Sequence, residues 1–92
     1  MQVHDNPDRS RFELSLEGGD IAIVDYRVDG DRILLTHAEV PPAYEGQGIG
    51  SQLARGVFER IRADGRLAVP LCSFMAAYAR RHPEYADIVA PA

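Results

Sequence analysis

The chain has 92 residues, of which 46% are hydrophobic and 26% charged, and its formal net charge is −4. This length suits one domain with one modest core, and the acidic balance argues against a general nucleic-acid-binding or anionic-membrane-binding surface. The sequence contains no apolar run near the roughly 20 residues of a membrane span, and its first residues contain no apolar signal core. The one cysteine, Cys72, excludes an internal disulfide and suits a reducing compartment. We therefore expect a cytoplasmic single domain over residues 1–92, a monomer or weak dimer that binds no metal.

Alternating apolar and polar residues predict an antiparallel meander in the first half of the chain. The first ten residues are polar and are expected to form a mobile lead-in. Three strand-like runs follow, separated by the turn signals Gly18-Gly19-Asp20 and Asp29-Gly30-Asp31. The predicted strands are 11–16, 21–28 and 32–40.

The next segment has the periodicity of a helix followed by a short strand. Apolar residues four apart predict a helix over 49–64, with Gly65 as its C-cap; they are Ile49, Leu53, Val57 and Ile61. The strand 67–71 follows this crossover helix and should therefore lie parallel to the third strand. Pro70 removes a backbone donor from it, so we expect the sheet there to be an edge or to be splayed apart.

The last segment predicts a second helix and a tail. Ser73 is expected to cap a helix from Phe74 to about Arg81, and Pro83 stops it. Residues 84–92 are expected to add an edge strand or to pack on the sheet. The whole pattern indicates a mixed α/β sandwich in the order β-β-β-α-β-α.

Three glycines at alternate positions, Gly46, Gly48 and Gly50, lie between the third predicted strand and the first helix. Glycine permits positive φ and close approach to the backbone, and free amides at a helix N-terminus favour a bound anion. The pattern predicts a strand–loop–helix phosphate cradle, and its plainer alternative is a glycine-rich turn. The spacing does not match the dinucleotide fingerprint Gly-x-Gly-x-x-Gly, and no Gly-Lys-Ser/Thr follows as a P-loop requires.

Catalytic candidates flank this loop in the sequence. Strand periodicity places His37 and Glu39 on the same face as Ile33 and Leu35, where the two could serve as general base and orienting partner. The alternative is a hydrogen-bonded sheet histidine beside a solvated carboxylate. Cys72 comes just before a helix N-terminus, which favours the thiolate, although a small buried hydrophobe is an equally simple interpretation. A gap between the third and fourth strands would open a slot from the loop to Cys72 and His37.

Two runs of sequence resemble a known family. The run Glu45-Gly46-Gln47-Gly48-Ile49-Gly50 is similar to the acetyl-coenzyme-A signature Arg/Gln-x-x-Gly-x-Gly/Ala of the GNAT acyltransferase superfamily, with Glu45 as a departure. The run from Cys72 to Tyr85, Cys-Ser-Phe-Met-Ala-Ala-Tyr-Ala-Arg-Arg-His-Pro-Glu-Tyr, resembles the hallmark of its small, single-domain NATD-like branch. The resemblance covers Tyr26 to Val89. It implies the minimal GNAT fold, an α/β fold whose mixed, mostly antiparallel sheet has its third and fourth strands splayed.

By this resemblance, the pantetheine arm of acetyl-coenzyme A (acetyl-CoA) runs between the splayed strands, and its pyrophosphate lies on the loop backbone. His37 and Cys72 match the proposed active-site pair of the branch, and Tyr78 stands about one residue short of the tyrosine that protonates the leaving thiolate. The pair of helices that usually builds the acceptor wall is absent, which implies an open acceptor site. The implied cofactor-binding residues are Val40, Glu45, Gly46, Gln47, Gly48, Ile49, Gly50 and Ser51.

The first functional hypothesis is transfer of an acetyl group from acetyl-CoA to a primary amine. The transfer would be direct, with His37 as base, or would pass through an acetyl thioester on Cys72. The competing hypothesis is a non-catalytic acyl-CoA-binding or interaction module that retains the cradle, and a third is a structural domain without a ligand. The sequence leaves the acceptor open, as either a small molecule or a protein amine.

Overall fold

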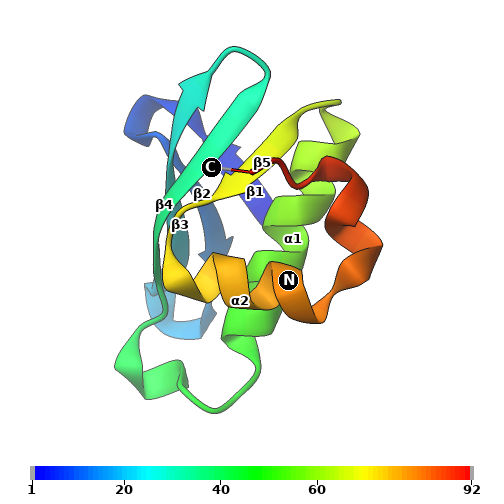
Figure 1. Ribbon diagram of the computed structural model, residues 1–92. Coiled ribbons are helices and arrows are strands. Elements are labelled where there is room, and N and C mark those ends of the chain that lie inside the picture. The colour runs from blue at the N-terminus through cyan, green and yellow to red at the C-terminus, as the bar shows by residue number, and fades with distance from the viewer. Residues whose placement is uncertain (1, 92) are drawn as a thin grey trace.

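The computed structural model describes residues 2–91 and contains one five-stranded sheet in the order β1-β2-β3-β4-β5. The first four strands are antiparallel neighbours, and β5 lies parallel to β4 as the crossover predicted (Figure 1). The mixed, mostly antiparallel sheet of the GNAT fold is therefore confirmed. The strands are β1 (Val3–Asn6), β2 (Arg11–Ser15), β3 (Ile21–Asp29), β4 (Arg32–Glu39) and β5 (Leu67–Pro70).

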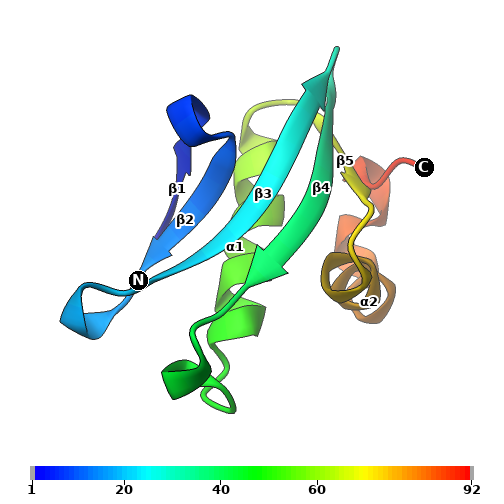
Figure 2. The same ribbon diagram turned by 90° about the vertical axis from the view of Figure 1, so that its left-hand side faces the viewer.

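The two helices, α1 (Ile49–Ala63) and α2 (Ser73–Arg81), cover one face of this sheet. Helix α1 crosses the face, and α2 lies beside it at the β5 edge, so in residues 2–91 the opposite face carries no helix (Figure 2). One core cluster joins the covered face to both helices, with Leu35, Leu53 and Phe58 fully buried. Short 3-10 turns connect the elements: η1 (Pro7–Arg9), η2 (Glu17–Gly19), η3 (Pro42–Tyr44) and η4 (Pro83–Ile88).

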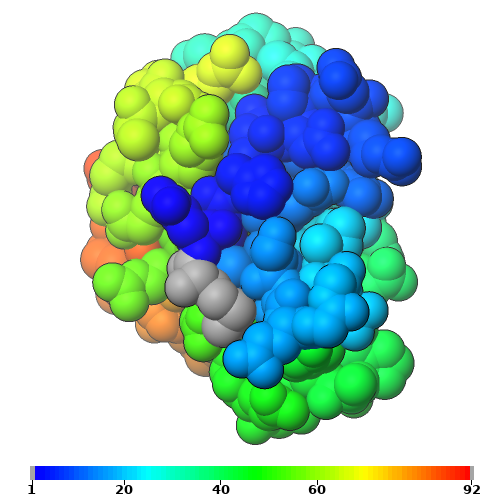
Figure 3. All heavy atoms as spheres, turned by 180° about the vertical axis from the view of Figure 1, so that it is seen from behind, coloured from blue at the N-terminus to red at the C-terminus, as the bar shows by residue number. Residues whose placement is uncertain are grey.

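The expectation of a mobile lead-in before the meander is wrong for residues 3–6, which form the edge strand β1. Val3 pairs with Leu14, and the Tyr26 hydroxyl donates to Asp5 Oδ1 over 2.6 Å. Seen from behind, β1 lies against α1 (Figure 3), where the side chain of Val3 packs over Gly56. A segment of four mostly polar residues is too short to show a strand period. The strand is stabilised by the elements that it contacts, which the local sequence does not reveal.

The ends of the helices agree only in part with the sequence prediction. The C-cap of α1 is Asp64 and not Gly65 as predicted; Gly65 follows it at φ +70°, and its amide donates to the Arg62 carbonyl. At α2 the N-cap is Cys72, and Ser73 is already the first helical residue, so the predicted Ser73 cap is wrong. The tail adds one bridge, Ala68 to Val89, to the outer edge of β5.

A β-bulge at Thr36 changes which face of β4 is buried. Tyr26 pairs with Leu35, but the preceding residue of β3, Asp25, pairs with His37, so β4 contains one residue more than its neighbour. Before the bulge, Leu35 is buried on the helix side, and after it Ala38 is the residue that packs against the core. The expectation that His37 and Glu39 share a face with Ile33 and Leu35 is therefore wrong. Both side chains are exposed and belong to the face without helices.

Candidate functional site

Strands β4 and β5 separate at one point, and the site begins there. Their pairing ends at Leu35 and Pro70, after which the amides of Leu71 and Cys72 both donate to the Leu35 carbonyl, over 2.9 and 3.0 Å. Beyond this junction β4 continues to Glu39, while the segment that follows β5 turns away into α2 (Figure 2). The predicted splay is present, but only past Leu35, because the backbone of β5 itself is paired with β4.

A cleft of about 500 Å³ lies along the free end of β4. Its walls come from three places: the end of β4, the glycine loop with the first turn of α1, and the first turn of α2. Of the predicted catalytic residues, the cleft lining includes His37 and Glu39. It also includes six of the eight predicted cofactor-binding residues. The lining residues are His37, Ala38, Glu39, Val40, Tyr44, Glu45, Gly46, Gly48, Ile49, Gly50 and Phe74.

The backbone of the glycine loop presents unused hydrogen-bond donors. Gly46 and Gly48 have φ of +78° and +76°, a left-handed conformation that residues with a side chain adopt only under strain. The first backbone bond of α1 runs from the Gln52 amide to the Gly48 carbonyl. Within residues 2–91, the amides of residues 46–51 donate to no backbone carbonyl. These donors, with the positive end of the α1 dipole behind them, can hold an anion.

Gly50 is a glycine for a different reason, since it has no positive φ and belongs to the helix. A Cβ on Gly50 would lie 2.9 Å from Cζ of Phe74, so the phenyl ring occupies the space that a side chain would need. The N-terminal turns of α1 and α2 therefore meet beside the cleft.

Cys72 lies next to the cleft but is not part of its lining. It is half-exposed, and its backbone amide donates a hydrogen bond to the carbonyl of Leu35, which precedes His37 by two residues in β4. The Cys72 carbonyl accepts the first backbone bond of α2, from Ala76. Cys72 is thus held at the junction where β4 and β5 separate, while His37 lines the cleft; a catalytic pairing of the two stays a prediction.

Tyr78 lies outside the cleft lining. It is 4% exposed and stacks between Phe58 and His82, with ring centroids 5.9 and 3.7 Å away. Burial raises the pKa of its hydroxyl, with a smaller contribution from the negative charge of Glu84. This position supports a packing role for Tyr78 and gives its hydroxyl no contact with the cleft.

Two other predicted cofactor-binding residues are also absent from the lining. The Gln47 side chain donates back to the Ala43 carbonyl over 3.3 Å, within the loop, and Ser51 is an exposed residue of the first turn of α1. Their backbone amides still belong to the unused set. Sequence reasoning missed Tyr44, whose hydroxyl donates to the Glu17 carbonyl and ties the loop to η2. It also missed Phe74 as a lining residue. The signals that could have suggested it are the glycine repeat at the start of α1 and the aromatic residue at the start of α2.

The lining includes the histidine His37 and the acidic residues Glu39 and Glu45, and in residues 2–91 no arginine is part of it. Across the same part of the chain, no three histidine, cysteine, aspartate or glutamate side chains come close enough to hold a metal ion. No helix there has the length and apolar character needed to cross a membrane.

Comparison with known proteins was made at the levels of family, sequence and structure. The family described as GCN5-related N-acetyl-transferase matches residues 11–88. Protein NATD1 of Gallus gallus is 33% identical over 85 residues, which are 90% of this chain and 77% of that protein. Protein NATD1 of Homo sapiens is 32% identical over 85 residues, 90% of this chain and 75% of that protein. The NMR solution structure of a GCN5-like protein from Staphylococcus aureus matches with a TM-score of 0.73 and 25% identity, over 99% of this chain and 89% of that one.

Proposed function

The chain belongs to the GCN5-related N-acetyltransferase family, and we propose that it moves an acetyl group from acetyl-CoA to a primary amine. The observation that carries the proposal is the set of unused backbone amides at residues 46–51, which faces a cleft that continues to the splayed end of β4. A cofactor with a pyrophosphate at one end and a thioester at the other fits this arrangement. Such a cofactor would lie with its phosphates on the loop and its thioester near His37.

The cradle would bind the pyrophosphate through the backbone. Gly46 and Gly48 allow the loop to turn its N–H groups outward, and Glu45, in place of the usual cation, contributes no attraction. The backbone of Ala38, at the free end of β4, and of Val40, directly after the strand, would pair with the amides of pantetheine as a strand would, because β5 no longer occupies that edge.

His37 would act as the general base in direct transfer. The amine nitrogen attacks the thioester carbonyl carbon, the carbon–sulfur bond breaks so that coenzyme A leaves as its thiolate, and the proton that the amine loses passes to the imidazole. Glu39 lies two residues along the same exposed face and would orient the imidazole or the incoming ammonium group. Because this face carries no helix within the described chain, the acceptor would approach from the open side of the sheet (Figure 2).

A covalent route through Cys72 is the second form of the same proposal. In that route the Cys72 thiolate attacks the acetyl-CoA carbonyl and coenzyme A leaves as its thiolate. The amine then attacks the acetyl-Cys72 thioester, the bond to sulfur breaks to restore the Cys72 thiolate, and the amine loses its proton to solvent. Cys72 is the N-cap of α2, so it lies at the positive end of that helix dipole. We assign Tyr78 no part in either route, because its ring stacks on His82 and it is not among the cleft-lining residues.

The test is turnover of acetyl-CoA in the presence of a mixture of primary amines. We expect amine-dependent release of coenzyme A, measured by chromatography, and an acetylated amine in the mass spectrum. His37→Ala should lower the rate by about 100-fold, the low end for loss of a general base. The matched control is His4→Ala, which removes an exposed histidine of β1 that lies outside the cleft lining.

The competing function is a binding module for acyl-CoA without catalysis. Glu45 in the cradle and the absent acceptor wall are the observations that favour it. Binding of acetyl-CoA without any turnover across a broad set of amines would favour the module over the enzyme. Absence of binding would contradict both.

A further inference from the structure

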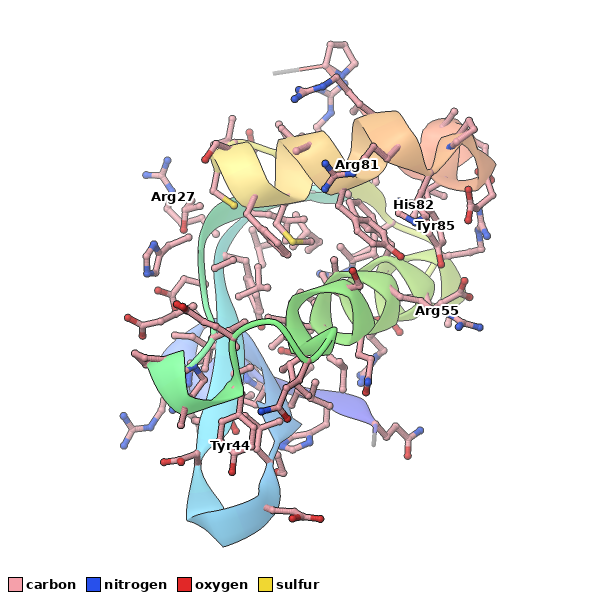
Figure 4. All side chains as sticks on the ribbon, turned by 90° about the horizontal axis from the view of Figure 1, so that it is seen from below. Arg27, Tyr44, Arg55, Arg81, His82 and Tyr85 are labelled. Atoms are coloured by element: carbon pink, nitrogen blue, oxygen red, sulfur yellow. The ribbon has the colours of Figure 1, made fainter. Side chains whose placement is uncertain are left out.

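Asp25 is the residue of β3 that stands directly opposite His37, since the register of β3 and β4 pairs their Cα atoms. Its neighbours in the strand, Val24 and Tyr26, are buried in the core against the helices, so Asp25 belongs to the other face of the sheet. Figure 4 shows Arg27, two residues further along β3, pointing away from both helices on that face. Asp25 and His37 therefore share the face from which the acceptor would approach.

The β-bulge at Thr36 creates this pairing. Tyr26 pairs with Leu35, so an unbroken register would place Thr36 opposite Asp25. It would also turn His37 toward the helices, and the one extra residue is what moves His37 across from Asp25. The Thr36 hydroxyl donates to the Asp25 carbonyl over 3.3 Å and ties the bulge to β3. Residues directly opposite each other have Cβ atoms about 4.5–5.5 Å apart, a separation that a carboxylate–imidazole hydrogen bond can span.

The carboxylate of Asp25 is available for such a bond. Arg11 of β2 faces Asp25 from the other side, but its Nε is already bound to Glu13 Oε2 at 2.6 Å. Within residues 2–91 no cationic nitrogen, that of His37 included, lies within 4.0 Å of the Asp25 carboxylate. Because the His37 side chain is exposed, rotation about its side-chain bonds can bring the ring to the carboxylate without displacing packed atoms.

Glu39 is the other carboxylate near His37 on this face, and it is less well placed to hold the ring. It lies two residues along the same strand, about 6.6 Å away in the strand direction, and its own partner in β3 is Ile23. Glu39 lines the cleft, whereas Asp25 does not. Asp25 could therefore hold the imidazole without occupying space that the ligand needs, and Glu39 stays free to receive the ammonium group of the acceptor.

We propose that Asp25 is the positioning residue that orients His37 for the proposed acetyl transfer, on which this role rests. The short Asp25 side chain would accept a hydrogen bond from Nδ1–H, the ring nitrogen nearer the backbone, and leave the Nε2 lone pair free. Nε2 takes the proton that the attacking amine loses, while Nδ1 keeps its own. The ionised carboxylate stabilises the imidazolium that forms, and the Nε2 proton then passes to solvent.

The first experiment is nitrogen NMR of the protein with ¹⁵N-labelled histidine, under alkaline conditions that keep imidazole neutral. The ¹⁵N shifts distinguish the Nδ1–H from the Nε2–H tautomer, and His37→Ala identifies the signals of His37 among the three histidines. We expect the Nδ1–H tautomer in the parent and the Nε2–H tautomer, which a free imidazole side chain favours, in Asp25→Ala. Asp29→Ala is the matched control, since it removes an exposed carboxylate from the end of the same strand and should leave the tautomer unchanged.

The second experiment measures amine acetylation by the same variants. Asp25→Ala should lower kcat at least about tenfold, a part of the roughly 100-fold loss expected without the base itself, and should leave the KM for acetyl-CoA unchanged. Asp25→Glu should recover part of the rate, because it restores the acceptor with a longer side chain. Asp29→Ala should retain the parental rate. A loss in Asp25→Ala that appears in KM alone would overturn the positioning role.

The two experiments separate this inference from the proposed function. The Nε2–H tautomer in the parent would overturn the Asp25–His37 pair and leave direct transfer with His37 intact. A tautomer that changes in Glu39→Gln but not in Asp25→Ala would also overturn it, because Glu39 would then hold the ring. Absence of turnover in a parent whose tautomer depends on Asp25 would overturn the proposed function while supporting the pair.

Discussion

Gly50 and Phe74 are in direct contact across the two helices, since a Cβ on Gly50 would lie only 2.9 Å from Cζ of Phe74. Both residues line the cleft, so this contact joins the N-terminal turns of α1 and α2 at the place where the ligand is proposed to bind. Three glycines occupy alternate positions in the loop, but they meet two different needs. Gly46 and Gly48 supply positive φ, whereas Gly50 supplies space.

Gly50→Ala should therefore weaken ligand binding without unfolding the protein. Alanine favours the helix by roughly 1 kcal/mol over glycine, but its methyl group must displace the Phe74 ring, which forms part of the cleft wall. Calorimetry with coenzyme A should show a loss of at least about threefold. The double variant Gly50→Ala/Phe74→Leu should recover part of the loss, and unchanged affinity in the single variant would show that the ring lies outside the bound ligand.

Gly48→Val should remove the cradle. The side chain would stand at φ +76° beside the free amides and would block the approach of a pyrophosphate. The affinity for coenzyme A should fall at least tenfold, about 1.4 kcal/mol. Gly30→Val is the control, because Gly30 has a similar φ of +62° in the β3–β4 turn, away from the cleft, and should lose stability alone. Equal affinities for Gly48→Val and the parent would exclude the cradle.

Hydrogen exchange should map the slot. Binding of coenzyme A should protect amides at the free end of β4, from Thr36 to Val40, and in the loop from 46 to 51. Residues 67–70 should not change, because the structure already pairs them with β4. Protection limited to the loop would mean that the ligand lies across the surface instead of entering the slot.

The covalent route predicts one acetyl group on Cys72. All ten basic residues other than histidine are arginines, so no lysine competes for acetylation in the intact mass spectrum. After incubation with acetyl-CoA, the parent should gain a single acetyl group that Cys72→Ala lacks. Both Cys72→Ala and Cys72→Ser should still bind coenzyme A, since the cradle lies elsewhere. Amine acetylation at the parental rate by Cys72→Ala would exclude this route and leave direct transfer with His37.

Two buried tyrosines should make the protein sensitive to alkali. Burial and hydrogen bonds to Asp5 and Glu59 raise the pKa of Tyr26 and Tyr85 to about 12, from 10.0. The folded state thus holds these protons more tightly than the unfolded state, so stability is fully present below pH 10 and is lost as pH rises through 12. Urea denaturation at a series of pH values should show this loss, and Tyr26→Phe/Tyr85→Phe should flatten it. The same slope in the double variant would assign the loss to other groups.

The sequence by itself determined the elements that have a clear period or a local signal. The β3 and β4 meander, the apolar stripe of α1, the turn at Gly65 and the stop at Pro83 all depend on near neighbours, whose contacts recur at 2.0 or 3.6 residues. The glycine loop belongs to the same class, since positive φ is a property of a single residue.

The tertiary structure decided the rest, because those features depend on contacts between distant residues. Strand β1 exists through its pairing with β2 and the packing of Val3 over Gly56, which the short sequence Val-His-Asp-Asn does not predict. The bulge at Thr36 reverses the face of His37 and Glu39, since one added residue shifts a period of two. The stacking of Tyr78 on His82 and the contact of Phe74 with Gly50 likewise depend on how α2 packs beside α1. The local periodicity of the sequence determines the secondary-structure elements, whereas packing between distant residues determines which side chains face the cleft.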